Sequence, residues 1–215
     1  MTLDKFITHL GHFFLILNTL LFIVSYTKKD KALKYFIMYL ILCLFIQIFS
    51  DLLFDLRVNN LFLSHYFFVG QFLFLSLFFS TLYNLKKIKN LNKILTIVIT
   101  IPFVTYLINF PEALKRFNIF EIAITSIPLI IYSFFFFVKK LEDHECKKYI
   151  YFNAGFFLYT LCSTLIFTLG NIGSGELKMY VWHFNTFLYI VFQILVFVEW
   201  FKNFRKPALV GLKKN

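Results

Sequence analysis

QIFSDLLFDLRVNNLFLSHYFFVGQ, residues 47–71, places a short polar turn between two long apolar runs. Both runs continue away from the turn, almost without charge, for about 20 residues, which is the length that an α-helix needs to cross a bilayer core of roughly 30 Å. Asp51, Asp55, Arg57 and His65 all lie close to the turn. The stretch therefore predicts a hairpin of two membrane-spanning helices whose polar residues gather at one membrane surface.

The rest of the chain has the same character. Of its 215 residues 60% are hydrophobic and only 15% are charged, whereas a soluble domain carries about 25% charged residues. We predict an all-α fold: a polytopic membrane protein with one seven-transmembrane-helix bundle over residues 1–215 and a basic cytoplasmic tail at 202–215. The expected helices cover about 6–26, 35–54, 61–83, 94–110, 119–138, 149–170 and 179–201.

The distribution of Lys and Arg predicts the orientation. If successive linkers lie on opposite sides, 17 of the 22 cationic residues share one side. The other side holds only Lys5, Arg57, Lys115, Arg116 and Lys178. Cytoplasmic loops carry such an excess, so we expect the N-terminus outside and the C-terminus in the cytoplasm. Because the charge lies in linkers and not on one face of a folded domain, the net charge of +11 does not indicate nucleic-acid binding.

Polar residues within the spans are the candidates for a site, because placing them in a membrane is costly. His9 and His12 share a face of the first helix, and Gln47, Asp51 and Asp55 form a stripe on the second. The last helix carries a stripe of Asn185, Tyr189 and Gln193. The set that maps to the outer helix ends is His9, His12, Asp51, Asp55, His65, Glu121 and His183. If these faces converge, they line a polar funnel that opens to the outside.

Three uses of such a funnel are consistent with its residues. It could bind a divalent metal such as zinc, with His9, His12, Asp51, His65 and His183 as the ligands. It could titrate with external pH, or it could bind a small polar or cationic ligand. Asp51 with His65 is the first expected pair, because one tight turn joins their helices. At 1.5 Å per residue, however, His65, His183 and Glu121 lie only about 3–6 Å below the surface, where they can reach water without forming one site.

Other polar residues predict contacts between or along helices. Asn18, Asn153 and Gln193 are expected to hydrogen-bond between helices. Glu199 has Lys202 three residues further on, which predicts a local ion pair. No cofactor apart from a divalent metal is expected.

The run NNLFLSHY at 59–66, together with Asn153 and Tyr159, resembles small seven-helix membrane proteins of Bacteroidota. Those proteins are similar to the membrane sensor modules that are attached to histidine kinases or encoded beside them. The resemblance implies a sensory or accessory role in a bacterial inner membrane, with a sensor kinase or another membrane protein as partner. It assigns no role to any single residue.

The first functional expectation is therefore a multi-pass membrane sensor, not an enzyme, that responds to an external ligand, ion or proton and signals through a separate partner. The first alternative is a small transporter or channel, in which Pro102 and Pro128 mark broken helices. The second alternative is an intramembrane metal-dependent hydrolase. The lipid bilayer is the one partner common to all three.

Overall fold

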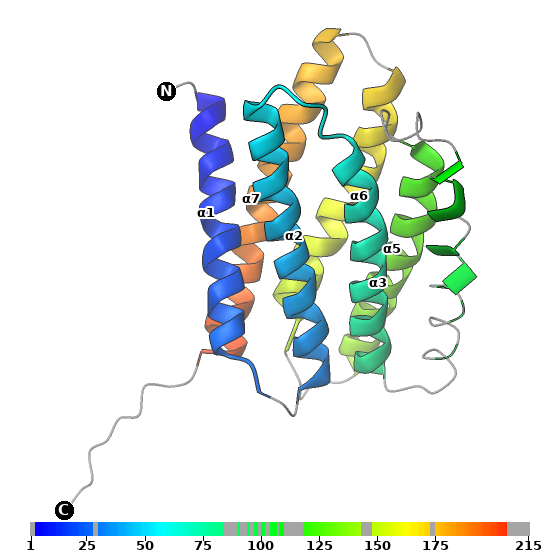
Figure 1. Ribbon diagram of the computed structural model, residues 1–215. Helices are drawn as coiled ribbons and strands as arrows, with labels where there is room; N and C mark the ends of the chain where they lie inside the picture. The colour runs from blue at the N-terminus through cyan, green and yellow to red at the C-terminus, as the bar shows by residue number, and fades with distance from the viewer. Residues whose placement is uncertain are drawn as a thin grey trace, which may run out of the picture.

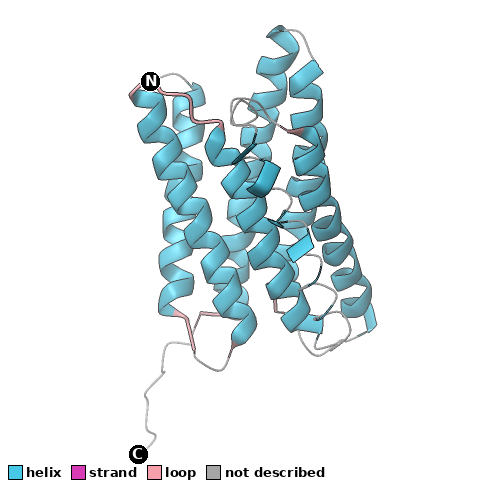
Figure 2. Cartoon of the chain, turned by 45° about the vertical axis from the view of Figure 1, so that its right-hand side comes forward, coloured by secondary structure: helices cyan, strands magenta, loops and turns pink. Residues whose placement is uncertain are grey.

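The computed structural model describes residues 3–27, 30–83, 118–142, 148–172 and 175–205, together with isolated positions between 90 and 109. Within these residues the chain forms helices and contains no strand (Figure 2). The helices shown in Figure 1 are α1 (Leu3–Val24), α2 (Lys31–Asp55), α3 (Phe62–Tyr83), α5 (Ile119–Glu142), α6 (Ile150–Ile172) and α7 (Gly175–Asn203). The all-helical class is confirmed.

Six of these described helices are long and apolar enough to cross a membrane. Most extend a few residues beyond the predicted apolar runs, as α7 does by beginning at Gly175. The expected span at 94–110 is described only at isolated positions, such as Ile94 and Val104, which are helical. The rest of that span and the tail from 206 onward lie outside the described residues. The fold is consistent with a multi-pass membrane protein, while the number of seven spans and their orientation stay predictions.

The six helices form a closed ring. Each packs against two neighbours, in the order α1, α2, α3, α5, α6, α7 and back to α1 (Figure 1). Helices α3 and α5 run in the same direction, because His65 near the start of α3 contacts Glu121 near the start of α5. The chain therefore returns from one end of the ring to the other between Tyr83 and Asn118. We call the end where α1 begins the upper end, and the end where α1 finishes the lower end, as in Figure 1.

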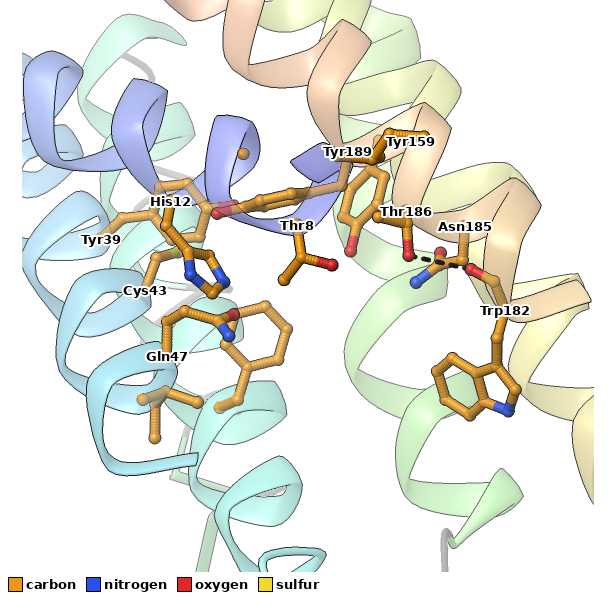
Figure 3. A pocket seen from close by; sticks show the side chains of 14 residues that line it. Thr8, His12, Tyr39, Cys43, Gln47, Tyr159, Trp182, Asn185, Thr186 and Tyr189 are labelled. Atoms are coloured by element: carbon orange, nitrogen blue, oxygen red, sulfur yellow. Dashed lines mark hydrogen bonds between the residues drawn. The ribbon is translucent and has the colours of Figure 1, made fainter. Parts of the chain in front are cut away.

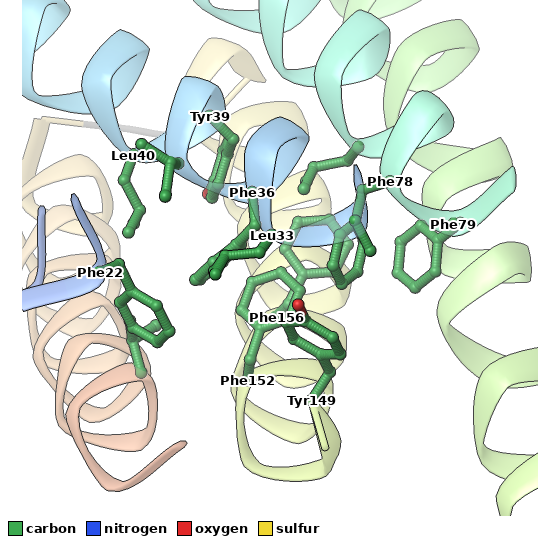
Figure 4. Close-up of a cluster of buried hydrophobic side chains, with 14 of the residues drawn as sticks. Phe22, Leu33, Phe36, Tyr39, Leu40, Phe78, Phe79, Tyr149, Phe152 and Phe156 are labelled. Carbon is green, nitrogen blue, oxygen red and sulfur yellow. The ribbon is translucent and has the colours of Figure 1, made fainter. Parts of the chain in front are cut away.

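Aromatic side chains fill the lower half of the ring. The ring centroids of Phe36 and Phe152 lie 4.4 Å apart, and Phe78 lies 5.5 Å from Phe152, so contacts join α2, α3 and α6 across the centre. Edge-to-face pairs of this kind add to the stabilisation that burial itself provides. We call this cluster the aromatic plug (Figure 4). Its members are Phe22, Phe36, Phe78, Phe79, Tyr149, Phe152, Phe156 and Phe192, all of them buried.

Polar side chains in the lower half are paired between helices. Asn18 donates from Nδ2 to the side-chain and backbone oxygens of Gln193, at 2.9 Å each. Ser133 Oγ donates to Asn153 Oδ1 at 2.8 Å, and Asn153 Nδ2 donates back to the Ser133 carbonyl at 3.0 Å. The predicted interhelical role of the three amides is confirmed. In a membrane such bonds help to hold helices together.

The predicted ion pair of Glu199 with Lys202 is wrong. Glu199 is fully buried, and its carboxylate accepts hydrogen bonds from the backbone N–H groups of Tyr149 at 2.5 Å and Tyr151 at 3.0 Å. Asn203 Nδ2 donates a further bond at 2.8 Å. The first N–H groups of a helix have no partner inside the helix and favour a negative charge. Glu199 on α7 supplies that charge to the start of α6, about 50 residues away in the sequence.

Candidate functional site

A cavity of about 300 Å³ lies in the upper half of the ring, where the aromatic plug ends (Figure 3). Five helices line it: α1, α2, α3, α6 and α7. Its hydrogen-bonding side chains are Thr8, His12, Tyr39, Cys43, Gln47, Tyr159, Asn185, Thr186 and Tyr189. Its apolar boundary consists of Ile7, Gly11, Ile46, Phe67 and Trp182. Ligand pockets in proteins combine such an apolar and aromatic wall with a few polar groups.

Three tyrosines form the floor of the cavity. Tyr39 comes from α2, Tyr159 from α6 and Tyr189 from α7, and Figure 3 shows them on the side of the cavity away from Gln47 and Trp182. The rings of Tyr159 and Tyr189 lie 5.9 Å apart. Tyr159 also stacks on Phe192 at 5.5 Å with an interplanar angle of 7°. The floor therefore rests directly on the aromatic plug, and any ligand in the cavity would contact side chains that continue into the plug.

Gly11 determines how closely α1 approaches α7 at the cavity. A Cβ at this position would lie 3.2 Å from two ring carbons of Tyr189, which is tighter than an ordinary contact. Small residues allow membrane helices to approach one another closely. The absence of a side chain at Gly11 lets the Tyr189 ring lie against the backbone of α1.

His12 and Asp51 form an ion-pair contact at the edge of the cavity. Nδ1 of His12 lies 3.3 Å from Oδ2 of Asp51, and Gln47 Nε2 donates to Asp51 Oδ1 at 3.0 Å. The His9 ring packs edge-on to the His12 ring at 6.3 Å. The predicted face of the two histidines and the predicted stripe of Gln47 and Asp51 are thus both found. A carboxylate beside Nδ1 favours the imidazole tautomer with its proton there, which leaves Nε2 as a hydrogen-bond acceptor.

The predicted pairing of Asp51 with His65 is wrong. His65 Nδ1 contacts Glu121 Oε2, joining α3 to α5, and both side chains are only 1% exposed. The expectation that the shallow residues reach water is wrong for His65 and Glu121, whereas His183 is exposed. Depth along a helix does not say which way a side chain points, and both of these side chains point inward. Glu121 also lies in the first turn of α5, where the helix dipole favours a carboxylate.

The remaining predicted residues are dispersed. Asp55 is exposed at the end of α2. His183 is exposed on α7, and its Nδ1 lies 2.6 Å from the carbonyl oxygen of Met179. Asn185 lines the cavity and accepts a hydrogen bond from Ser163 Oγ at 2.8 Å.

These positions do not support the predicted metal site. Among the described residues, no three His, Cys, Asp or Glu side chains gather so that they could hold a metal ion. The predicted zinc ligands His9, His12, Asp51, His65 and His183 are instead distributed over a cavity edge, a buried pair and an exposed helix face. The single polar funnel expected from the sequence is therefore replaced by a cavity that contains His12 and Asn185 and by a separate buried pair.

The sequence-based prediction included Tyr189 of the cavity floor, as part of the stripe on the last helix, but missed Tyr39 and Tyr159 because it concentrated on charged residues and histidine. A usable signal was present on α2. Tyr39, Cys43, Gln47 and Asp51 follow one another at intervals of four residues, so the outer stripe continues two turns inward. All four side chains line the cavity or contact a residue that does.

The chain matches no protein-family profile, no curated protein and no solved structure.

Proposed function

We propose that this protein is a seven-helix membrane sensor that receives a small external ligand in the upper cavity and signals through a separate partner protein. The observation that carries the proposal is the contrast along the bundle axis: the upper part of the ring encloses a cavity with an apolar wall and several hydrogen-bonding groups, and the buried aromatic plug fills the ring below it. A receptor needs a pocket with a closed floor, whereas a channel needs a continuous path. The excess of Lys and Arg in the lower linkers supports an upper end that faces outside.

The lining residues favour a ligand that is mainly apolar and carries one or two hydrogen-bonding groups. Tyr39, Phe67, Trp182 and Tyr189 offer aromatic surface. Hydroxyl and amide groups line the same volume, and the contact between His12 and Asp51 lies at its edge. A volume of about 300 Å³ is at the small end of the range for ligand pockets. A small aromatic alcohol or amide has this size and chemistry.

The cavity floor is joined to the lower end of the bundle through α6 and α7. Tyr159 and Tyr189 lie on these helices, and Glu199 on α7 binds the start of α6 through Tyr149. The Tyr149 hydroxyl donates to Asp30 Oδ2 at the start of α2, at 3.3 Å. A ligand that shifts the floor tyrosines would act on helices that meet again at the lower surface, where we place the contact with the partner.

Thermal unfolding of the purified protein with a set of small aromatic alcohols and amides tests the proposal. A ligand at 100 times its Kd should stabilise the protein by about 2.7 kcal/mol. Thr186→Leu should abolish this gain, because it removes a hydroxyl and fills part of the cavity. Thr81→Leu is the matched control. Both threonines donate from Oγ1 to the carbonyl oxygen four residues earlier, at 2.8 Å for Thr81 and 3.0 Å for Thr186. Thr81, however, does not line the cavity.

A transporter is the second candidate, and Pro128 within α5 favours it, because proline weakens a helix where it must bend. Flux of a bound compound into liposomes separates the two functions. We expect the compound to bind to the protein without crossing the liposome membrane. Flux that Thr186→Leu abolishes would instead assign transport to the same cavity.

A further inference from the structure

A second pocket, of about 310 Å³, lies at the lower end of the bundle. It is bounded by the ends of α3 and α5 and by the starts of α2 and α6. Three lysines line it, Lys139, Lys140 and Lys148, and the acidic side chain among its lining residues is Asp30. Tyr149 of the aromatic plug also borders it, so the plug separates this pocket from the upper cavity.

Aromatic rings hold the three ammonium groups around the pocket. Lys139 Nζ lies 5.7 Å from the centre of the Tyr83 ring and 3.4 Å from the Tyr83 carbonyl oxygen. Lys140 Nζ lies 5.7 Å from the centre of the Phe136 ring, and Lys148 Nζ lies 5.3 Å from that of Phe204. Cations over aromatic faces are stabilised without losing their ability to donate hydrogen bonds. The rings therefore keep the three ammonium groups close to the pocket.

Asp30 offsets only part of this charge, and its oxygens already have structural partners. Its Oδ1 accepts from the Leu33 N–H at 2.9 Å, which caps α2. Its Oδ2 accepts from the Tyr149 hydroxyl at 3.3 Å. Among the described residues of the lining, three cations against one carboxylate leave an excess of two positive charges.

We infer that this lower pocket binds a phosphate monoester. Such a group carries between one and two negative charges at neutral pH and has three strong acceptor oxygens, which matches the excess charge and the three ammonium donors. Leu82 and Phe136 give the pocket an apolar wall for the rest of the molecule. The phosphate can belong to a lipid headgroup or to a soluble ester. Basic pockets between membrane helices on the cytoplasmic side bind anionic headgroups, and this end carries the cationic linkers.

The test uses the purified full chain and one probe for each source. Phosphatidic acid is the lipid probe, and phosphatidylcholine, which has no net charge, is the comparison. Native mass spectrometry measures the binding of each lipid to the protein. Glycerol 3-phosphate is the soluble probe, and calorimetry measures its affinity for the protein. Lys139→Gln combined with Lys148→Gln should weaken binding of at least one probe by about tenfold or more, since each lysine near a membrane surface contributes about 1 kcal/mol.

Lys34→Gln combined with Lys202→Gln is the matched control. Both lysines are exposed on described helices near the same end, but neither lines the pocket. This double variant should change the affinity by less than about twofold. Equal losses in the two double variants would show general attraction to a basic surface and would overturn the inference. Failure of the wild-type protein to bind either probe would also overturn it.

Asp30→Asn provides a second variant that does not remove a lysine. Asparagine still caps α2, because its side-chain oxygen can accept from Leu33. The change removes the carboxylate from the pocket and should tighten phosphate binding by about threefold to fivefold. Weaker or unchanged binding would contradict the inference. The Asp30→Asn measurement tests the inference even if the double lysine variant does not fold. Because no part of the test involves the upper cavity, its outcome is independent of the sensor proposal.

Discussion

The two halves of the ring use the same helices in opposite ways. Helix α2 presents Tyr39, Cys43 and Gln47 to the cavity above and Leu33 and Phe36 to the buried cluster below. In the upper half the side chains leave a space of about 300 Å³, whereas in the lower half buried rings fill the centre. The difference shows how the same helices can line an open cavity in one part of the ring and pack as a filled core in the next.

Polar groups follow the same division. In the lower half Asn18 and Asn153 each donate to another helix, and Glu199 accepts from one. Around the cavity, hydroxyl and amide groups border open volume. The buried pair of His65 and Glu121 is the exception, because it lies in the upper half but behaves as part of the packed structure. The comparison therefore predicts large losses of stability for changes in packed groups and small losses for changes at the cavity edge.

Removing a ring from the plug should have the largest effect. Phe152 is fully buried and contacts Phe36 and Phe78. Phe152→Ala should lower the free energy of unfolding by about 4 kcal/mol, because the cavity it leaves cannot be filled by the surrounding rings. Chemical denaturation in detergent measures the loss. Phe135→Ala, at a position that is 55% exposed, is the control, and an equal loss there would show that the plug has no special role.

Breaking the buried pair should rank second. Glu121→Ala should cost about 3 kcal/mol, because it leaves His65 buried without its carboxylate. Replacing both residues by leucine should recover most of that loss, since an apolar pair of similar volume is often as stable as a buried ion pair. A double-mutant cycle provides the measurement. Strictly additive losses would mean that the two side chains do not depend on each other.

Glu199→Gln should have an intermediate effect. One carboxylate oxygen becomes an NH₂ group, which cannot accept, so either the Tyr149 N–H, which bonds to Oε1, or the Tyr151 N–H, which bonds to Oε2, loses its acceptor. We expect a loss of about 2 kcal/mol, the penalty for leaving a buried donor unpaired. Asp55→Asn makes the same chemical change at an exposed site and should be close to neutral. Thermal unfolding compares the two variants, and similar melting temperatures would contradict the capping role of Glu199.

Asp51→Asn should have the smallest effect, and that effect should depend on pH. The Asp51 side chain is 48% exposed and the His12 side chain 19% exposed, so their attraction is partly screened by solvent. A protonated imidazole attracts the carboxylate, so in acidic solution the variant should lose less than about 1 kcal/mol. A neutral imidazole attracts the carboxylate less, so in alkaline solution the loss should shrink. Stability curves in acidic and in alkaline solution measure this difference, and a loss that grows with pH would contradict it.

Much of the fold could be predicted from the sequence, because a bilayer leaves few solutions for long apolar runs. The candidate site was harder to predict from the sequence. His9 with His12 and Gln47 with Asp51 were predictable, since their spacing within one helix determines the contact. The partners of His65 and Glu199 were not, because they depend on which helices are neighbours in the ring and on how each helix is rotated. Tyr39 and Tyr159 were missed because a tyrosine in an apolar run has the same sequence signature whether it lines a cavity or packs in a core.

Cysteine accessibility tests most directly the claim that the cavity opens only at the upper end. Thr186→Cys would be placed in a chain in which Cys43, Cys146 and Cys162 are replaced by alanine, with Lys139→Cys in the same background as the comparison. In oriented vesicles, a charged membrane-impermeant thiol reagent should modify position 186 only from the side of the N-terminus, and position 139 only from the opposite side. Modification of position 186 from the side of the C-terminus, or from neither side, would contradict the account.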